Sequence, residues 1–236
     1  MTTDTLETPL EFAERLGLTF HNPSLLTRAL THRSYINEHP EALEDNERLE
    51  FLGDAILDFV VGAWLYHHLP EMPEGRLTSL RAALVRNTQL AEFARQLNLG
   101  QALRLGHGEA ESGGRTRYNV LGSAFEALIG ALYLDQGLEA VQTFVEPLLS
   151  EGVRLVLAEN RDRDPKSLFQ EHMQANGLGT PTYRIVDISG PDHERQYTVQ
   201  ALVNDTVYGE GTGPSKQAAS KAAARDALQK LKQHSG

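Results

Sequence analysis

The sequence predicts an all-α domain followed by a small α+β domain with the element order α-β-β-β-α. Two observations carry this prediction. Through residues 1–158, apolar side chains recur at every third or fourth position, which is the period of helices packed on one face. From about residue 180, three short stretches alternate polar and apolar residues, and helical stretches flank them. The 236 residues are enough for one large or two small domains, each with a core.

The charge pattern changes at the same place. Residues 1–163 contain no lysine and have a net charge of −10, whereas residues 164–236 hold all five lysines and have a net charge of zero. Such a change usually marks two modules of different chemistry. Residues 158–165, "AENRDRDP", are polar and end in proline, as linkers often do. We therefore expect domains at 1–158 and 165–236, joined by a linker at 159–164.

Composition excludes several classes of protein. The sequence has no apolar run long enough to span a membrane, and Met1 begins a polar, acidic segment rather than a signal peptide. It has no cysteine, which excludes disulfides and zinc sites built from thiolates. We expect a cytoplasmic protein with no membrane partner. The negative net charge argues against a protein coated with nucleic acid, so any basic face must be local.

The helical pattern of the first domain occurs in seven stretches. In order, they are "LEFAERLGL", "SLLTRALTH", "RLEFLGDAILDFVVGAWLYHHL", "RLTSLRAALVR", "TQLAEFARQLNL", "NVLGSAFEALIGALYLD" and "LEAVQTFVEPLLSEGVRLVLA". Pro23 and Pro73 suit the first turn of a helix, and Asn87 suits a helix start.

Residues 105–119, "LGHGEAESGGRTRYN", interrupt this pattern with four glycines. We interpret them as a mobile loop. The loop is either a long connection or, with Arg115 and Arg117, a contact surface for an anionic ligand such as RNA.

The second domain begins with the helical stretch "KSLFQEHMQANG", which Gly177 ends. The stretches "TYRIVDIS", "RQYTVQALV" and "TVYGEGTG" are expected to be strands, and "SKQAASKAAARDALQKL" an alanine-rich helix.

Four acids lie on one stripe of an otherwise apolar helix. Glu47, Glu50, Asp54 and Asp58 are spaced by three, four and four residues. Like charges at these spacings repel each other, and more strongly when they are partly buried. A bound divalent cation would remove this repulsion, and oxygen-only ligands suit Mg²⁺ or Mn²⁺. The alternative is a solvated acidic face. Asp58 lies a turn beyond the others and is expected to face water.

A further acid, Glu126, is surrounded by apolar residues in "NVLGSAFEALIGALYLD". The small residues nearby suit the close approach of another helix. We expect Glu126 to complete a cluster with Glu47, Glu50 and Asp54. The alternative is a charge at the edge of a helix-packing surface.

These motifs resemble the bacterial ribonuclease III family. "NERLEFLGDAIL" is similar to the family signature, and "AFEALIGALYLD" to its second acidic segment. "THRSYINEH", "LVRNTQLAEFARQLNLG" and "LRLGHGEAESGGRTR" follow the family in the expected order. The resemblance implies a helical endonuclease domain followed by a double-stranded RNA-binding domain. It also implies Mg²⁺-dependent hydrolysis of double-stranded RNA to 5′-phosphate and 3′-hydroxyl ends, with ribosomal RNA precursors among the substrates.

The resemblance also assigns site residues. Glu47 and Glu50 match the two glutamates of the signature, Asp54 matches its aspartate, and Glu126 matches the glutamate of the second segment. It implies Asp54 and Glu126 as catalytic residues, Glu47, Asp54 and Glu126 as metal ligands, and Glu50 as a supporting acid. Ser123 stands where the family usually has an aspartate, and serine is a neutral, weak ligand. This departure bears on the metal affinity, on the choice between Mg²⁺ and Mn²⁺, and on the rate.

The departure at Ser123 keeps a second function open, that of a double-stranded RNA-binding protein with weak or Mn²⁺-dependent catalysis. A third possibility is a metal-dependent hydrolase of another substrate, against which the RNA-binding domain argues. A duplex has two strands and one chain supplies one acid cluster, so we expect a homodimer, as the resemblance also implies. Phe51 is assigned to its interface.

The second domain should recognise the A-form shape of the duplex. A helix that begins near Ser215 directs its free N–H groups at the phosphate backbone, and Lys216 adds charge. Matching positions of the family assign RNA contacts to Gln170, Glu171, His193, Ser215, Lys216 and Lys221. Gln217 replaces a residue that is commonly basic, so we expect weaker binding that is more sensitive to salt.

Overall fold

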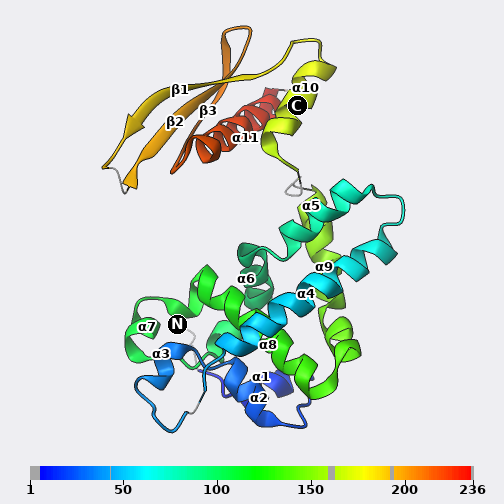
Figure 1. Ribbon diagram of the computed structural model, residues 1–236, viewed down its shortest axis with the longest axis vertical. Helices are drawn as coiled ribbons and strands as arrows, with labels where there is room; N and C mark the ends of the chain where they lie inside the picture. Colours follow the sequence, from blue (N-terminus) through cyan, green and yellow to red (C-terminus); the bar gives the residue numbers. More distant parts are fainter. Residues whose placement is uncertain (1–5, 43, 159–162, 192–193, 235–236) are drawn as a thin grey trace. The chain divides into compact units, whose positions relative to one another are not determined.

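The computed structural model describes residues 6–42, 44–158, 163–191 and 194–234 (Figure 1). The chain divides into two compact units, Met1–Asp162 and Arg163–Gly236. The expected linker, 159–164, spans this division, and its residues 159–162 lie outside the described residues.

The first unit is helical, as predicted. Its helices are α1 (Pro9–Arg15), α2 (Pro23–Ala29), α3 (Arg33–Ile36), α4 (Glu47–His68), α5 (Glu74–Leu84), α6 (Asn87–Gln96), η1 (Leu99–Gln101), α7 (His107–Glu111), η2 (Gly114–Thr116), α8 (Tyr118–Gln136) and α9 (Leu138–Ala158), where η marks a 3-10 helix. Pro23 and Asn87 begin α2 and α6, as expected, whereas Pro73 is the N-cap residue of α5.

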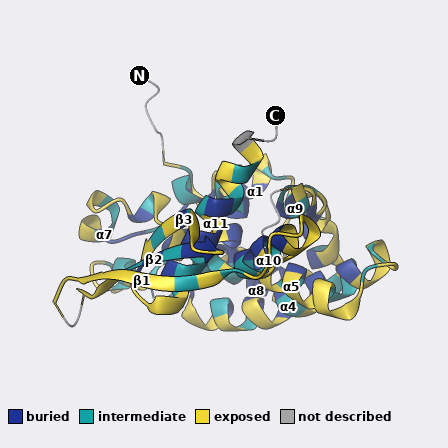
Figure 2. Ribbon diagram, turned by 90° about the horizontal axis from the view of Figure 1, so that it is seen from above, coloured by how far each residue is buried: buried dark blue, intermediate teal, exposed yellow. Residues whose placement is uncertain are grey.

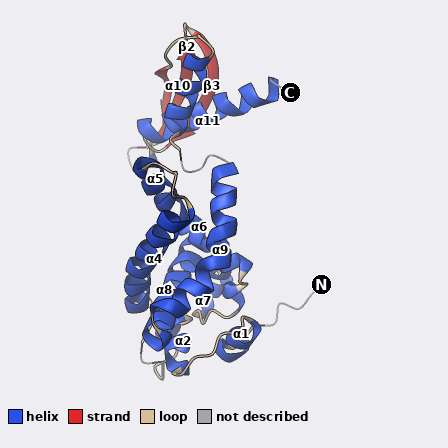
Figure 3. Cartoon of the chain, turned by 90° about the vertical axis from the view of Figure 1, so that its right-hand side faces the viewer, coloured by secondary structure: helices blue, strands red, loops and turns tan. Residues whose placement is uncertain are grey.

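Helix α8 lies at the centre of this unit, and its most extensive packing partner is α4 (Figures 1 and 3). Buried residues recur along much of α8, whereas α7 has no buried residue and is largely exposed (Figure 2). Two glycines allow α4 and α8 to meet. A Cβ atom built on Gly53 would lie 1.8 Å from the backbone oxygen of Glu126, and one built on Gly130 would lie 2.3 Å from that of Leu49. The two backbones are therefore in direct contact along this line.

The expected loop at 105–119 contains structure instead. It holds α7 and η2, and Arg115 ties it to the preceding residues while Arg117 pairs within it. Arg115 Nη1 donates hydrogen bonds to the backbone oxygens of Gly100 (3.0 Å) and Leu103 (2.6 Å). Arg117 forms an ion pair with Glu109, at 2.6 Å between Nη1 and Oε1. The prediction of a mobile loop from its glycines is therefore wrong, because these bonds fix the segment.

The second unit has the predicted order α-β-β-β-α. Its elements are α10 (Pro165–Ala175), β1 (Thr182–Ser189), β2 (Gln196–Val203), β3 (Thr206–Gly213) and α11 (Lys216–His234). The sheet is antiparallel in the order β1-β2-β3, with Ile185 opposite Val199 and Val199 opposite Gly211. Both helices join one core with the sheet. The alanines of α11 that face the sheet are fully buried, which lets this helix lie close to the strands.

Within the described ranges, we find no helix that is long and apolar enough to cross a membrane.

The contact at Gly53 gives a stability prediction. Gly53→Ala should destabilise the protein by at least about 3 kcal/mol, because the new methyl group overlaps backbone that cannot move aside as a side chain can. Gly75→Ala on α5 is the matched control, since a Cβ there meets no atom within 4 Å. It should change stability by no more than about 0.5 kcal/mol. Urea denaturation measures both, and a Gly53→Ala protein as stable as the control would contradict the packing described here.

Candidate active site

The contact between α4 and α8 decides which acids approach each other. An α-helix turns by about 100° per residue, so angles can be counted from Gly53, which marks the line of contact. Glu50 is turned from it by about 60°, Asp54 by about 100°, Glu47 by about 120° and Asp58 by about 140°. All four lie on the same side, but Glu50 and Asp54 lie nearest to α8.

Glu126 lies on α8 at this contact, and its surroundings raise its pKa to about 7. Burial is the largest cause, because it disfavours the charged carboxylate. Repulsion by Asp54 and then by Glu50 adds to it. The signature acids that act on Glu126 are therefore these two.

Ser123 lies one turn before Glu126 on α8 and contacts the same cluster. Its Oγ donates a hydrogen bond to Oε1 of Glu50, at 2.8 Å. The neutral residue thus occupies the expected place beside the acids, and it acts on Glu50 as a donor.

Glu47 and Asp58 have other partners. Glu47 Oε1 lies 3.0 Å from Nη1 of Arg33, and Asp58 Oδ1 lies 3.4 Å from Nε of Arg81. Glu47 was expected to be a metal ligand and Glu50 a supporting acid. The structure places Glu50, rather than Glu47, beside Glu126. The spacing of three and four residues could not separate the two, because the separation depends on where α8 crosses α4.

The side chains near this contact suit a hard cation, because all of them offer oxygen atoms as metal ligands. They are those of Glu50, Asp54, Glu126 and Ser123. The carboxylates are close enough to perturb one another, but they are not gathered into a ready site. In the part of the chain that the structure describes, no three His, Asp or Glu side chains form a group that could hold a metal ion. A cation bound here would need these side chains to move closer together.

A small cleft of about 160 Å³ opens beside this cluster. Three short segments line it, from the starts of α3, α4 and α8, and its residues are His32, Arg33, Asn46, Glu47, Glu50, Asn119, Val120 and Ser123. Glu50 and Ser123 belong to both the cleft and the cluster. Arg33 is not among the site residues predicted from the sequence, although it lies in the "THRSYINEH" motif that supports the family resemblance.

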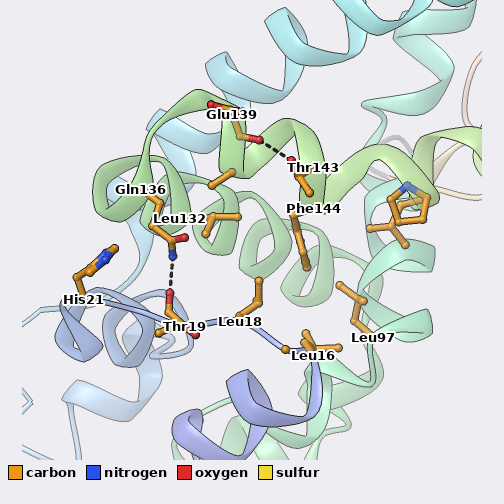
Figure 4. Close-up of a pocket in the computed structure, with 14 residues that line it drawn as sticks. Leu16, Leu18, Thr19, His21, Leu97, Leu132, Gln136, Glu139, Thr143 and Phe144 are labelled. Carbon is orange, nitrogen blue, oxygen red and sulfur yellow. Dashed lines mark hydrogen bonds between the residues drawn. The ribbon is translucent and has the colours of Figure 1, made fainter.

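A larger cavity, of about 840 Å³, lies between the 16–21 segment, the end of α8 and α9 (Figure 4). Leu18, Leu132 and Phe144 are among the apolar residues that line it, and Gln136 donates a hydrogen bond to the backbone oxygen of Thr19 across it. None of the clustered acids lines this cavity, so its size does not make it the active site.

The residues assigned to RNA binding lie in different settings. Ser215 caps α11, because its Oγ accepts a hydrogen bond from the backbone N–H of Ala218 at 3.1 Å, and Lys216 is exposed beside it. The side chain of Lys221 lies on a different face of α11 from that of Lys216. It is turned about 140° from Lys216 on the helix, and its Nζ lies 2.9 Å from Oδ2 of Asp164.

On α10, Gln170 and Glu171 are both exposed, and Glu171 forms an ion pair with Arg163. His193 lies outside the described residues. Arg115 donates hydrogen bonds to backbone oxygens inside the first unit. Arg117 stays partly exposed beside Glu109.

The raised pKa of Glu126 predicts how stability depends on pH when no metal is present. The folded protein binds this proton more tightly than the unfolded chain, where the pKa is near 4.5. The stabilisation by the proton is therefore full below about pH 4.5 and is lost as the pH rises through about 7. Glu126→Gln, which stays neutral, should match the wild type at pH 5. At pH 8 it should be more stable by about 1–2 kcal/mol, a value that allows for solvent screening.

Denaturation in a chelator at the two pH values measures this effect. Asp58→Asn is the control, because Asp58 pairs with Arg81 on the far side of the acid stripe, and it should show no such gain at pH 8. Added Mn²⁺ should then stabilise the wild type and not Glu126→Gln. A Glu126→Gln protein that is less stable than the wild type at pH 8 in the chelator would contradict the repulsion described here.

The Ribonuclease-III-like family matches residues 22–152, and the double-stranded RNA binding motif matches residues 165–231. The proteins named Ribonuclease 3 from Desulforamulus reducens and Roseiflexus sp. are 47% identical over 218 residues and 46% identical over 224 residues. These alignments cover 92% and 94% of this chain, and 89% and 94% of the relatives.

Among solved structures, the nuclease domain of ribonuclease III from Campylobacter jejuni is 40% identical, with a TM-score of 0.55. The match covers 60% of this chain and 95% of that one, which was described for flexibility in a region involved in dimer formation. Both matched families, in this order, agree with the resemblance found in the motifs. The chain therefore belongs to the ribonuclease III family.

Proposed function

We propose that this ribonuclease III-type endoribonuclease is a cytoplasmic enzyme that hydrolyses double-stranded RNA with Mg²⁺ or Mn²⁺. The products would carry 5′-phosphate and 3′-hydroxyl ends, and ribosomal RNA precursors and other structured transcripts would be substrates. The observation that carries this proposal is the approach of Glu50 and Asp54 to Glu126 across the contact of α4 and α8, in a chain that also has a double-stranded RNA-binding unit.

Glu50, Asp54 and Glu126 would hold the cation, and the burial of Glu126 strengthens its attraction for positive charge. Ser123 orients Glu50 through its hydrogen bond. When bound, such a cation lowers the pKa of water and neutralises negative charge that develops on the reacting oxygens.

Ser123 supports the alternative, weak or Mn²⁺-dependent catalysis. Its hydroxyl brings no negative charge, and its hydrogen bond to Glu50 uses one of the carboxylate lone pairs that a cation would need. An aspartate there would bring a charge of its own. The preference for Mn²⁺ over Mg²⁺ is therefore part of the proposal.

A homodimer would give each strand of the duplex its own acid cluster. Phe51 is 80% exposed and Leu134 is 53% exposed, which is unusual for side chains this apolar. Both line a cavity of about 540 Å³ with Leu49 and Leu52. A surface with an exposed aromatic ring beside a cavity is one that a second copy of the chain can cover. Sedimentation that finds only monomer at the working concentration would contradict this part of the proposal.

The second unit would hold the duplex through the start of α11 and through α10. Ser215 and Lys216 present the exposed helix N-terminus to phosphates. The engagement of Lys221 by Asp164 leaves Lys216 as the main cation at this end of the helix. Fewer phosphate contacts would weaken binding but give it a shallower dependence on salt, not the greater sensitivity expected from Gln217, because fewer counterions are released.

Incubation of the purified protein with a long RNA duplex tests the function. The duplex should be cut in Mn²⁺, and more slowly in Mg²⁺. Ser123→Asp should lower the Mg²⁺ concentration needed for half-maximal rate by about tenfold, because it adds a charged ligand. Ser150→Asp, which adds the same charge at an exposed position on α9, is the matched control. It should leave the Mg²⁺ concentration for half-maximal rate unchanged.

Glu126→Gln should abolish cleavage while duplex binding persists. No cleavage by the wild type in either cation, with binding intact, would overturn the proposal. An unchanged Mg²⁺ requirement in Ser123→Asp would show that Ser123 does not set the metal preference.

A further inference from the structure

The ion pair of Arg33 and Glu47 lies in the cleft beside the acid cluster and has no evident structural purpose. Its side chains are 70% and 53% exposed. Pairs this exposed contribute little to stability, because water screens the attraction and two long side chains must be ordered. The pair is therefore available for another role.

Arg33 has the chemistry to bind a phosphate. The guanidinium carries five N–H donors in a rigid fork that fits two phosphate oxygens at once. Glu47 engages Nη1, and most of the group stays open to solvent. Glu47 thus fixes the direction of Arg33 and leaves donors for a ligand.

The position of Arg33 makes this chemistry useful. RNA that reaches the cluster brings phosphates toward Glu50, Asp54 and Glu126, which repel them. Among the described residues that line the cleft, Arg33 is the side chain with a permanent positive charge. The neighbouring His32 has a partner for its Nδ1 atom, which accepts a hydrogen bond from the backbone N–H of Ser34 at 3.2 Å.

We propose that Arg33 is a substrate-positioning residue that binds a phosphate of the RNA strand entering the cleft, and that Glu47 holds Arg33 in place rather than binding the cation. The inference rests on the proposed function and deepens it, since it names the group that offsets the repulsion between substrate and acids. Glu47 then acts through Arg33, whereas Glu50 and Asp54 act on the cation.

Duplex binding tests the first part without any cleavage. Arg33→Ala is introduced into the full chain that already carries Glu126→Gln, and binding of a short RNA duplex is measured at several salt concentrations. The affinity should fall by about tenfold. The slope of log affinity against log salt should become shallower by about one, as expected for the loss of one phosphate contact.

Glu47→Gln should weaken binding in the same way, but only several-fold. The double variant should bind no worse than Arg33→Ala alone, because Glu47 acts through the arginine. The exposed pair of Arg154 and Glu151 on α9, at 2.6 Å, is the matched control. Arg154→Ala and Glu151→Gln should leave both affinity and slope unchanged.

Cleavage kinetics separate positioning from metal binding. With Glu126 intact, Arg33→Ala and Glu47→Gln should raise KM for the duplex more than they lower kcat, and the Mn²⁺ concentration for half-maximal rate should stay within about twofold. Glu50→Gln should raise that Mn²⁺ concentration by about tenfold. Equal unfolding curves confirm that each variant is folded.

Two results would overturn the inference. One is an Arg33→Ala protein that binds the duplex as well as the Arg154→Ala control. The other is a Glu47→Gln protein whose Mn²⁺ requirement rises as much as that of Glu50→Gln. A wild type that binds duplex through Arg33 but never cuts it would instead overturn the proposed function, so the two failures are distinguishable.

Discussion

The direct contact of two helix backbones is the constraint on which the rest of this structure depends. Gly53 on α4 lies against the backbone of Glu126 on α8, and Gly130 lies against that of Leu49. A side chain at either glycine would push the helices apart. Because they touch, a glutamate on the face of α8 is partly buried beside two acids of α4. The perturbed pKa of Glu126, the order of the acids around α4 and the position of Ser123 all follow from this contact.

The contact also sorts the charged residues into two groups. Glu50 and Asp54 lie close to Glu126, where their repulsion is unfavourable until a cation arrives. Glu47 and Asp58 lie further round α4, and each pairs with an arginine, Arg33 or Arg81. The first group is suited to binding a metal and the second to holding arginines. In this arrangement Arg33 lines the cleft that opens beside the acids.

The sequence predicted the elements well because apolar periodicity and turn residues are local signals. It also predicted that acids of "NERLEFLGDAIL" would meet Glu126. It could not rank Glu50 above Glu47, because their spacing from Asp54 suits one stripe equally and only the crossing line of α8 distinguishes them. Contacts with residues distant in the sequence also determine the orientation of Lys221 and the order of the 105–119 segment. Lys221 was placed on the correct helix, but Asp164 determines where it points. The glycines of 105–119 suggested mobility, whereas Arg115 fixes that segment to the backbone of Gly100 and Leu103.

The location of bound Mn²⁺ tests the central claim most directly. Anomalous scattering from crystals of the protein soaked in Mn²⁺ would locate the ion. The account predicts a peak within bonding distance of carboxylate oxygens from Glu50, Asp54 and Glu126, with Glu47 still turned to Arg33. A peak bound by Glu47 in place of Glu50, or one far from Glu126, would contradict it.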